Sequence, residues 1–177
     1  FTDITAESNL GDRDYAMGAA TGDIDNDGDL DLYIGNLGAD RLYRNDGEGQ
    51  FTDVTFEAGI EVGGWSSSIL MVDVDQDGHL DIYVTRYLDY DEKITGADAA
   101  GRPEYPPPSQ FRGLDDRLLR NDGDGTFTDI TDTSGISDHP GRGLGVIAGD
   151  FDADGNVDFY VGNDGDANHA WLGDGTG

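Results

Sequence analysis

Short segments of alternating apolar and polar residues recur along the chain, and turns rich in Asp and Gly separate them. Residues 30–34 read Leu-Asp-Leu-Tyr-Ile, a period of two that predicts a half-buried β-strand. Residues 16–21 are small and mostly apolar, which suits the innermost strand of a crowded sheet. Residues 41–44 and 50–54 flank an Asn-Asp-Gly turn and are predicted to form a β-hairpin. This part of the chain therefore predicts four consecutive short strands.

The same arrangement occurs three times. The segment Phe-Thr-Asp-Ile/Val-Thr is found at residues 1–5, 51–55 and 127–131. An Asp-rich loop recurs in phase with it, beginning at Asp23, Asp73 and Asp150. The equivalent strands are predicted at residues 67–72, 80–85, 117–120 and 126–130, and then at residues 144–148, 157–161 and 170–172. A single helical turn closed by Gly is predicted at residues 55–59 and 131–135.

Four strands in about 50 residues is the size of a β-propeller blade. We therefore expect an all-β fold and one repeat domain spanning residues 1–177, built from three four-stranded blades. The repeats are placed at residues 1–50, 51–126 and 127–177, with an insertion at 88–115. Propeller rings have roughly four to eight blades. Two alternatives follow: a homodimer that pairs two halves into a six-bladed ring, or a fragment of a larger propeller. The spare segment at residues 1–5 could complete a last blade.

The charge balance excludes several classes of partner. The chain has 10 Lys and Arg against 38 Asp and Glu, a formal net charge of −28. Such a charge repels phosphate backbones and anionic lipid, so we expect no nucleic-acid partner. No apolar run approaches the roughly 20 residues of a membrane span, so we expect no membrane insertion. Since there is no Cys, disulfides and thiolate zinc sites are excluded.

The three Asp-rich loops share the pattern Asp-x-Asp-x-Asp-Gly-x-x-Asp. Positions one, three, five and nine can present carboxylate oxygens to one point. Gly at position six permits the sharp turn, and the backbone carbonyl at position seven can add another oxygen. No His or Cys side chain belongs to this set, which favours Ca²⁺ over zinc or copper. We therefore predict about three Ca²⁺ sites. An EF-hand does not fit, because Ile34, Val84 and Val161 stand where its bidentate Glu belongs.

The repeats resemble the FG-GAP/VCBS repeats of integrin-α-type propellers, in which such loops bind Ca²⁺ within the blades. Residues 41–55, 105–111 and 162–171 are similar to ASPIC/UnbV-type and cartilage-acidic-protein-like repeats. The resemblance implies carboxylate ligands at Asp23, Asp25, Asp27, Asp31, Asp73, Asp75, Asp77, Asp81, Asp150, Asp152, Asp154 and Asp158. It also implies that the backbone carbonyls of Asp29, His79 and Asn156 complete the sites. Integrin-like ligand binding does not follow, because the aromatic-Gly and Gly-Ala-Pro elements of the signature are absent.

We expect a secreted or cell-surface scaffold for protein or glycan binding, active in adhesion, and not an enzyme. His79, His139 and His169 are far apart in the sequence, and no Ser lies in a nucleophile elbow. The insertion is the candidate partner surface because it combines Tyr, Phe and scarce Arg residues with a Pro-rich stretch. The alternatives are a carbohydrate-binding lectin that uses these aromatics, and a purely structural, self-assembling half-propeller without a ligand.

Overall fold

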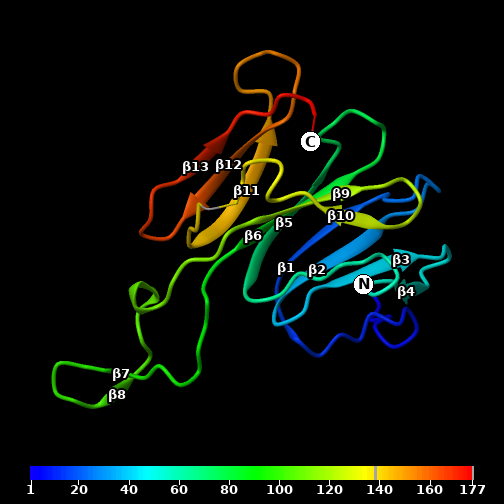
Figure 1. Cartoon of the computed structure of the whole chain (residues 1–177). Helices are drawn as coiled ribbons and strands as arrows, with labels where there is room; N and C mark the ends of the chain where they lie inside the picture. The colour runs from blue at the N-terminus through cyan, green and yellow to red at the C-terminus, as the bar shows by residue number, and fades with distance from the viewer. Residues whose placement is uncertain (138, 177) are drawn as a thin grey trace.

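The structure, a computed structural model, describes residues 1–137 and 139–176 and is all-β (Figure 1). The first blade is an antiparallel sheet in the order β1 (Tyr15–Gly22), β2 (Asp31–Leu37), β3 (Arg41–Asn45) and β4 (Phe51–Asp53). The second blade comprises β5 (Ser66–Val72), β6 (Asp81–Arg86), β9 (Arg117–Asn121) and β10 (Phe127–Asp129). The third blade has three strands, β11 (Gly143–Gly149), β12 (Asp158–Asn163) and β13 (His169–Trp171). These sheets confirm the predicted all-β fold of propeller blades.

Every strand predicted between residues 16 and 172 forms, with ends that differ by at most three residues. The Phe-Thr-Asp segments at residues 51–53 and 127–129 are β4 and β10, the outer strands of the first and second blades. Both strands therefore lie just beyond the repeat boundaries predicted from the sequence. Residues 1–5, in contrast, form no strand. The equivalent segments pair with β3 and β9, and among the described residues no such strand adjoins residues 1–5.

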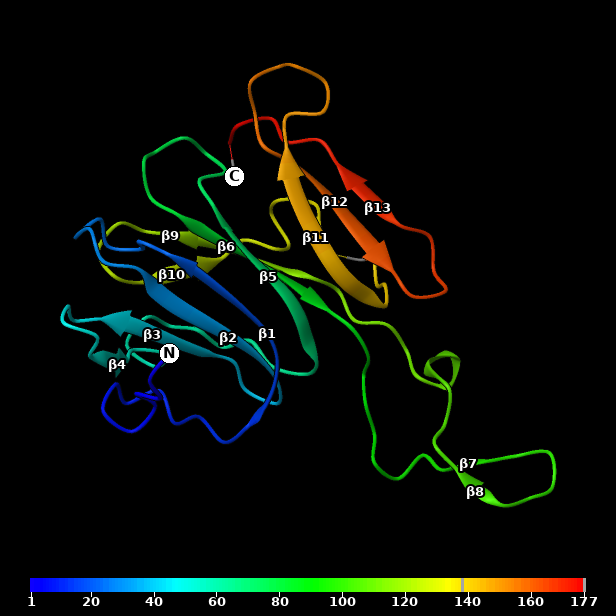
Figure 2. The same ribbon diagram turned by 180° about the vertical axis from the view of Figure 1, so that it is seen from behind.

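The inner strands β1, β5 and β11 lie side by side, so the blades stack face to face (Figure 2). One apolar cluster fills the space between the first and second blades and another the space between the second and third. Strand β6 contributes to both, because Ile82 and Val84 point to the first cluster and Tyr83 to the second. The small residues of β1 permit this close approach, since a Cβ atom on Gly18 would lie 2.4 Å from the Ser67 carbonyl oxygen.

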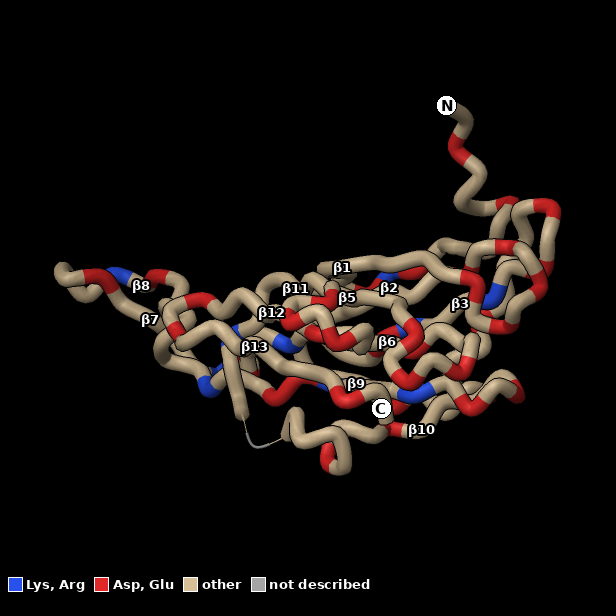
Figure 3. The backbone as a smooth tube through the Cα atoms, turned by 90° about the horizontal axis from the view of Figure 1, so that it is seen from above, with Lys and Arg blue, Asp and Glu red and all other residues tan. Residues whose placement is uncertain are grey.

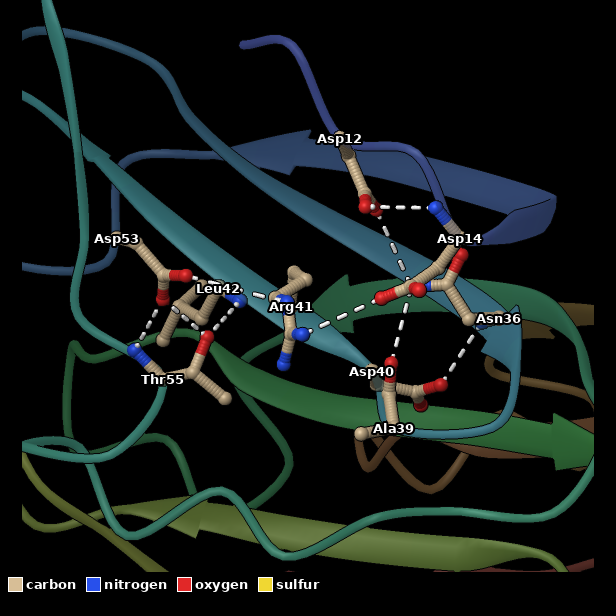
Figure 4. Close-up of polar contacts among 9 residues, drawn as sticks. All are labelled: Asp12, Asp14, Asn36, Ala39, Asp40, Arg41, Leu42, Asp53 and Thr55. Carbon is tan, nitrogen blue, oxygen red and sulfur yellow. Dashed lines mark hydrogen bonds and ion pairs between the residues drawn. The ribbon is translucent and has the colours of Figure 1, made fainter. Parts of the chain in front are cut away.

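The repeated Phe-Thr-Asp-Ile/Val-Thr motif joins the outer strand to its neighbour (Figure 4). In the first blade, Asp53 Oδ1 accepts a hydrogen bond from the backbone N–H of Thr55, at 3.0 Å. The Thr55 hydroxyl oxygen accepts from the backbone N–H of Leu42 on β3, at 2.9 Å. The carboxylate of Asp53 also lies 3.9 Å from the guanidinium of Arg41. The second blade repeats all three contacts with Asp129, Thr131, Leu118 and Arg117.

The predicted helical turns follow this motif. The backbone N–H of Ala58 bonds to the carbonyl of Val54 at 2.8 Å, and Gly59 closes the turn with a positive φ of 72°. The turn at residues 131–135 has the same form. The turn at residues 55–59 ends against the outer strand of the second blade, because the N–H of Phe127 donates to the carbonyl of Ala58.

A polar clamp, buried in the first two blades and exposed in the third, holds the second strand of each blade to the start of the third strand. In the second blade, Asp116 Oδ2 accepts from the Tyr83 hydroxyl at 2.8 Å and Oδ1 accepts from the backbone N–H of Arg86 at 2.9 Å. In the first blade, Asp40 makes the same bonds with Tyr33 and Asn36. In the third, Asn168 replaces the acid: its Oδ1 accepts from the Asn163 N–H, and its Nδ2 donates to the Tyr160 hydroxyl oxygen. The clamp can therefore form with a neutral amide in place of the carboxylate.

The insertion, residues 88–115, forms an arm that projects from the second blade and carries β7 (Gly96–Ala97), β8 (Pro103–Glu104) and a 3-10 turn, η1 (Pro108–Gln110) (Figure 2). Its base is packed, because the ring of Tyr90 lies 5.7 Å from Trp65 and 5.4 Å from Phe111. Its tip is open, and Tyr105 there is 94% exposed. The arm thus combines its own small core with exposed aromatic surface.

Candidate metal centre

The three Asp-rich loops connect the two innermost strands of each blade, and they share one backbone conformation. Position four is left-handed in each loop, with φ of 60° at Asn26, 61° at Gln76 and 65° at Ala153. Gly28 at position six has a φ of 97°, a value that favours Gly over any residue with a side chain. The repeated sequence pattern therefore produces a repeated loop geometry.

Backbone N–H groups hold the carboxylates of each loop in place. Asp23 Oδ1 accepts from the N–H of Asp27 at 3.1 Å, and its Oδ2 accepts from the N–H of Gly28 at 3.0 Å. Asp73 and Asp150 make the equivalent pair of bonds in the second and third loops. These bonds fix the orientation of the position-one carboxylate in each loop.

The loops gather predicted ligands into three acidic groups, each with oxygens within 4.8 Å of one another. The groups are Asp23, Asp25 and Asp27; Asp73, Asp75 and Asp81; and Asp150, Asp152 and Asp158. Positions one and three take part in every group. The third member is position five in the first loop and position nine in the others, so Asp31, Asp77 and Asp154 stand outside these tight groups. Metal ligation stays a prediction for all twelve Asp residues and for the carbonyls of Asp29, His79 and Asn156.

The Asp at position nine is fully buried in all three loops. Asp81 Oδ2 accepts from the N–H of Val74 and its Oδ1 accepts from the N–H of Asn121, both at 2.8 Å. Burial raises the pKa of Asp81 to about 6, although these bonds oppose the shift, and the charges of Asp75 and Asp77 raise it further. Burial likewise raises the pKa of Asp31. A cation beside these carboxylates would offset the cost of their negative charge.

Two side chains link consecutive loops. The Nδ2 amide of Asn26 in the first loop donates to the Gly78 carbonyl of the second loop and lies 3.1 Å from the His79 ring nitrogen Nδ1. Gln76 Nε2 bridges the second loop to the third by contacting the Gly155 carbonyl and the Asn156 side-chain oxygen, both at 3.2 Å. The sequence analysis missed these links, because position four is a variable position of the loop pattern. The feature of the sequence that could have indicated these links is the amide side chain at position four in two of the three loops, Asn26 and Gln76.

Asn121 adds a further link between blades that the sequence analysis missed. It is 1% exposed, and its Nδ2 amide donates to the Ile24 carbonyl of the first loop at 2.8 Å and to the Leu80 carbonyl at 3.2 Å. Asn45, at the same repeat position, reaches only the Leu30 carbonyl of its own blade. The first loop is thus anchored to the second blade through both Asn26 and Asn121.

The donor set fits a hard divalent cation. The three groups offer carboxylate oxygens alone, and several negative charges converge in each. Elsewhere, the rings of His139 and His169 both lie against Trp171, the first edge-on and the second tilted, and the two His ring centroids are 6.3 Å apart. Acidic residues occur on loops over much of the molecule (Figure 3). In the three Asp-rich loops, however, the repeat brings the carboxylates of positions one and three together with a third carboxylate in every copy.

Comparison with known proteins agrees with the repeat. A family model described as FG-GAP-like repeat matches residues 23–84 and 112–161, which is more than half of the chain. Cartilage acidic protein 1 of Xenopus tropicalis is 48% identical over 46 residues, and that of Homo sapiens is 46% identical over 46 residues. Each match covers 26% of this chain and 7% of the relative. Among the described residues, no helix is long and apolar enough to span a membrane. With its matched repeats in stacked blades of three or four strands, the chain belongs to the family of FG-GAP-like repeat proteins.

Proposed function

We propose that this chain is a calcium-binding β-propeller scaffold, in which one Ca²⁺ in each of three loops stabilises the blade. The observation that carries the proposal is the repetition of one acidic group, with oxygens within 4.8 Å of one another, in the same loop of three blades. Oxygen-only donors suit Ca²⁺, which accepts a variable coordination geometry, better than Mg²⁺, which requires a stricter octahedral geometry.

The ion's role would be electrostatic. Two like charges 4 Å apart repel by about 4 kcal/mol at an effective dielectric constant of about 20. Each loop holds at least three such charges, one of them on a fully buried residue in the second and third loops. Bound Ca²⁺ would replace this repulsion by attraction and hold the two inner strands of the blade together.

Thermal unfolding with and without Ca²⁺ tests the proposal. One site at a Ca²⁺ concentration of 100 times its Kd adds about 2.7 kcal/mol to the free energy of unfolding. We expect Ca²⁺ to raise the Tm and EDTA to lower it, and isothermal titration to give three sites. Asp75→Asn should reduce the stoichiometry to two, whereas Asp89→Asn, at an exposed position on the arm, should leave three. A Tm that does not respond to either Ca²⁺ or EDTA would contradict the proposal.

We propose that the scaffold acts outside the cell and binds a protein or glycan through the arm, without catalysis. Millimolar extracellular Ca²⁺ would keep even weak sites occupied. The exposed rings of Tyr105 (94%) and Tyr90 (45%) support the arm as the contact surface. A glycan array probed with the protein and with Tyr105→Ala checks the lectin alternative. Glycan binding by the protein that is lost in Tyr105→Ala would favour the lectin alternative. No glycan binding by either protein would favour a protein ligand.

A further inference from the structure

A groove of about 740 Å³ lies on the first blade, between strands β3 and β4 and the segment that leads on to the second blade. We call it the first-blade groove, and its main lining residues are Arg41, Phe56, Glu57, Ile60, Glu61 and Val62. Ile60 and Val62 are the buried apolar part of this lining, whereas Phe56 is 91% exposed. Among the described residues that line the groove, none belongs to the arm or to the predicted metal ligands. The groove is therefore separate from both of these features.

The turn at residues 55–59 does not require an aromatic residue at position 56. The same turn forms at residues 131–135 with Asp132 in the place of Phe56, and a backbone hydrogen bond of 2.8 Å closes both copies. The two acids of the groove, Glu57 and Glu61, are likewise replaced by Thr133 and Ser137. The first copy thus combines an exposed ring with two acids that the fold of the repeat does not demand. Exposed aromatic residues of this kind are enriched where proteins meet their partners.

The groove also carries negative charge that its own cation does not neutralise. The guanidinium of Arg41 is shared by two carboxylates, Asp14 at 3.2 Å and Asp53 at 3.9 Å (Figure 4). Glu57 and Glu61 are exposed, and within the described part of the chain neither carboxylate has a hydrogen bond or an ion pair. Because these two charges share the groove with an exposed ring, it is complementary to a cation that is also planar or partly apolar.

We propose that the first-blade groove binds an arginine side chain of a partner protein. A guanidinium is planar, so it can stack on the ring of Phe56 while its N–H groups donate to Glu57 and Glu61. The methylene groups of the side chain would cover the apolar surface of Ile60 and Val62. Lysine has the charge but neither the plane nor the forked donors, and it fits this set less well.

The charge of the whole chain favours such a partner. A net charge of −28 attracts basic proteins over long range and raises the rate at which they meet the chain. The groove would then select among them by contact with the ring and the two acids. This contact goes beyond the proposed function, since it uses neither the arm nor the Asp-rich loops. Its failure would therefore leave the calcium proposal intact.

Titration with short peptides tests the groove, monitored by NMR chemical shifts at a constant Ca²⁺ concentration. The probe is acetyl-Gly-Ser-Arg-Ser-Gly-amide, and its control carries citrulline, a neutral isostere, in place of Arg. The Arg peptide should shift the backbone signals of residues 55–63, and the citrulline peptide should not. Phe56→Ala should weaken binding by about 2- to 30-fold, the range expected for a cation–π contact. Tyr105→Ala, which removes an exposed ring on the arm, should leave the affinity unchanged.

Two double variants separate the groove from the overall charge. Glu57→Gln with Glu61→Gln should weaken binding of the Arg peptide by about 2- to 30-fold, since two exposed ion pairs are lost. Glu48→Gln with Glu92→Gln removes the same charge at exposed positions outside the groove. At physiological ionic strength, where charges are screened beyond about 8 Å, this pair should have little effect. Equal losses in the two double variants would show that binding follows net charge alone. That result, or an affinity that Phe56→Ala leaves unchanged, would overturn the proposal.

Discussion

The Nδ2 amide of Asn26 donates a 3.1 Å hydrogen bond to the carbonyl oxygen of Gly78, a residue 52 positions away in the next Asp-rich loop. Gln76 makes the equivalent bond to Gly155, whereas Ala153 at this position of the third loop has no amide to donate. Two of the three candidate metal loops thus restrain the backbone of the next loop. Order in one loop is therefore expected to help order its neighbour.

Asn26→Ala should weaken Ca²⁺ binding to the first two loops. A hydrogen bond contributes about 0.5–1.5 kcal/mol, which corresponds to about a 2- to 13-fold change in affinity. Isothermal titration with Ca²⁺ measures this change. Asn26→Gln is the matched control, because Gln76 makes the same bond from the same loop position. Equal loss in both variants would show that the link to Gly78 does not couple the loops.

Gly18 and Gly145 occupy the same position of the repeat but have different surroundings. A Cβ atom on Gly18 would lie 2.4 Å from the Ser67 carbonyl oxygen of the second blade, whereas one on Gly145 would meet nothing within 4 Å. Gly18→Ala should therefore lower the free energy of unfolding by about 1–3 kcal/mol through overpacking. Gly145→Ala should change it by less than about 0.5 kcal/mol. Urea denaturation of the two variants measures these losses, and equal losses would contradict the prediction.

Asn121 and Asn45 form a second matched pair. Asn121 is buried and bonds to the Ile24 carbonyl across the blade interface, whereas Asn45 bonds within its own blade. Asn121→Ala leaves that carbonyl without this donor, and an unsatisfied buried polar group costs about 1–3 kcal/mol. We expect Asn45→Ala to cost less, because Asn45 is only partly buried. Urea denaturation of the two variants compares the costs, and a larger loss for Asn45→Ala would contradict the assigned role of Asn121.

Much of the fold follows from the sequence because the same strand pattern occurs three times, and each copy supports the reading of the others. Residues 30–34 alone could be a strand in many folds, but their repetition at 80–85 and 157–161 defines a blade. The acidic loops were identified for the same reason. Contacts between blades could not be predicted from the repeat. The hydrogen bonds of Asn26, Gln76 and Asn121 depend on how the sheets stack, which the pattern within one repeat does not determine. The pairing of residues 1–5 likewise depends on which strand lies nearby, which no local pattern determines.

The buried carboxylate of Asp116 gives the fold a measurable dependence on pH. Burial raises its pKa to about 6 from an ordinary value of 3.8, although the Arg86 N–H, the Tyr83 hydroxyl and the Arg86 charge oppose the shift. The folded state therefore holds this proton more tightly than the unfolded chain does. The resulting contribution to stability is fully present below about pH 3.8 and is lost as the pH rises through about 6.

Asp116→Asn should remove this contribution while keeping the clamp, because Asn168 in the third blade contacts the equivalent backbone N–H and Tyr hydroxyl, accepting from Asn163 and donating to Tyr160. Relative to the wild type, the variant should gain up to about 3 kcal/mol in free energy of unfolding between pH 3.5 and pH 7.5. Urea denaturation across this range, with EDTA throughout so that Ca²⁺ occupancy stays constant, measures the gain. Asp89→Asn, at an exposed acid, should run parallel to the wild type. If Asp116→Asn runs parallel as well, Asp116 does not titrate near pH 6, and the loss of stability with rising pH must come from other buried acids such as Asp40 and Asp81, whose pKa values burial also raises.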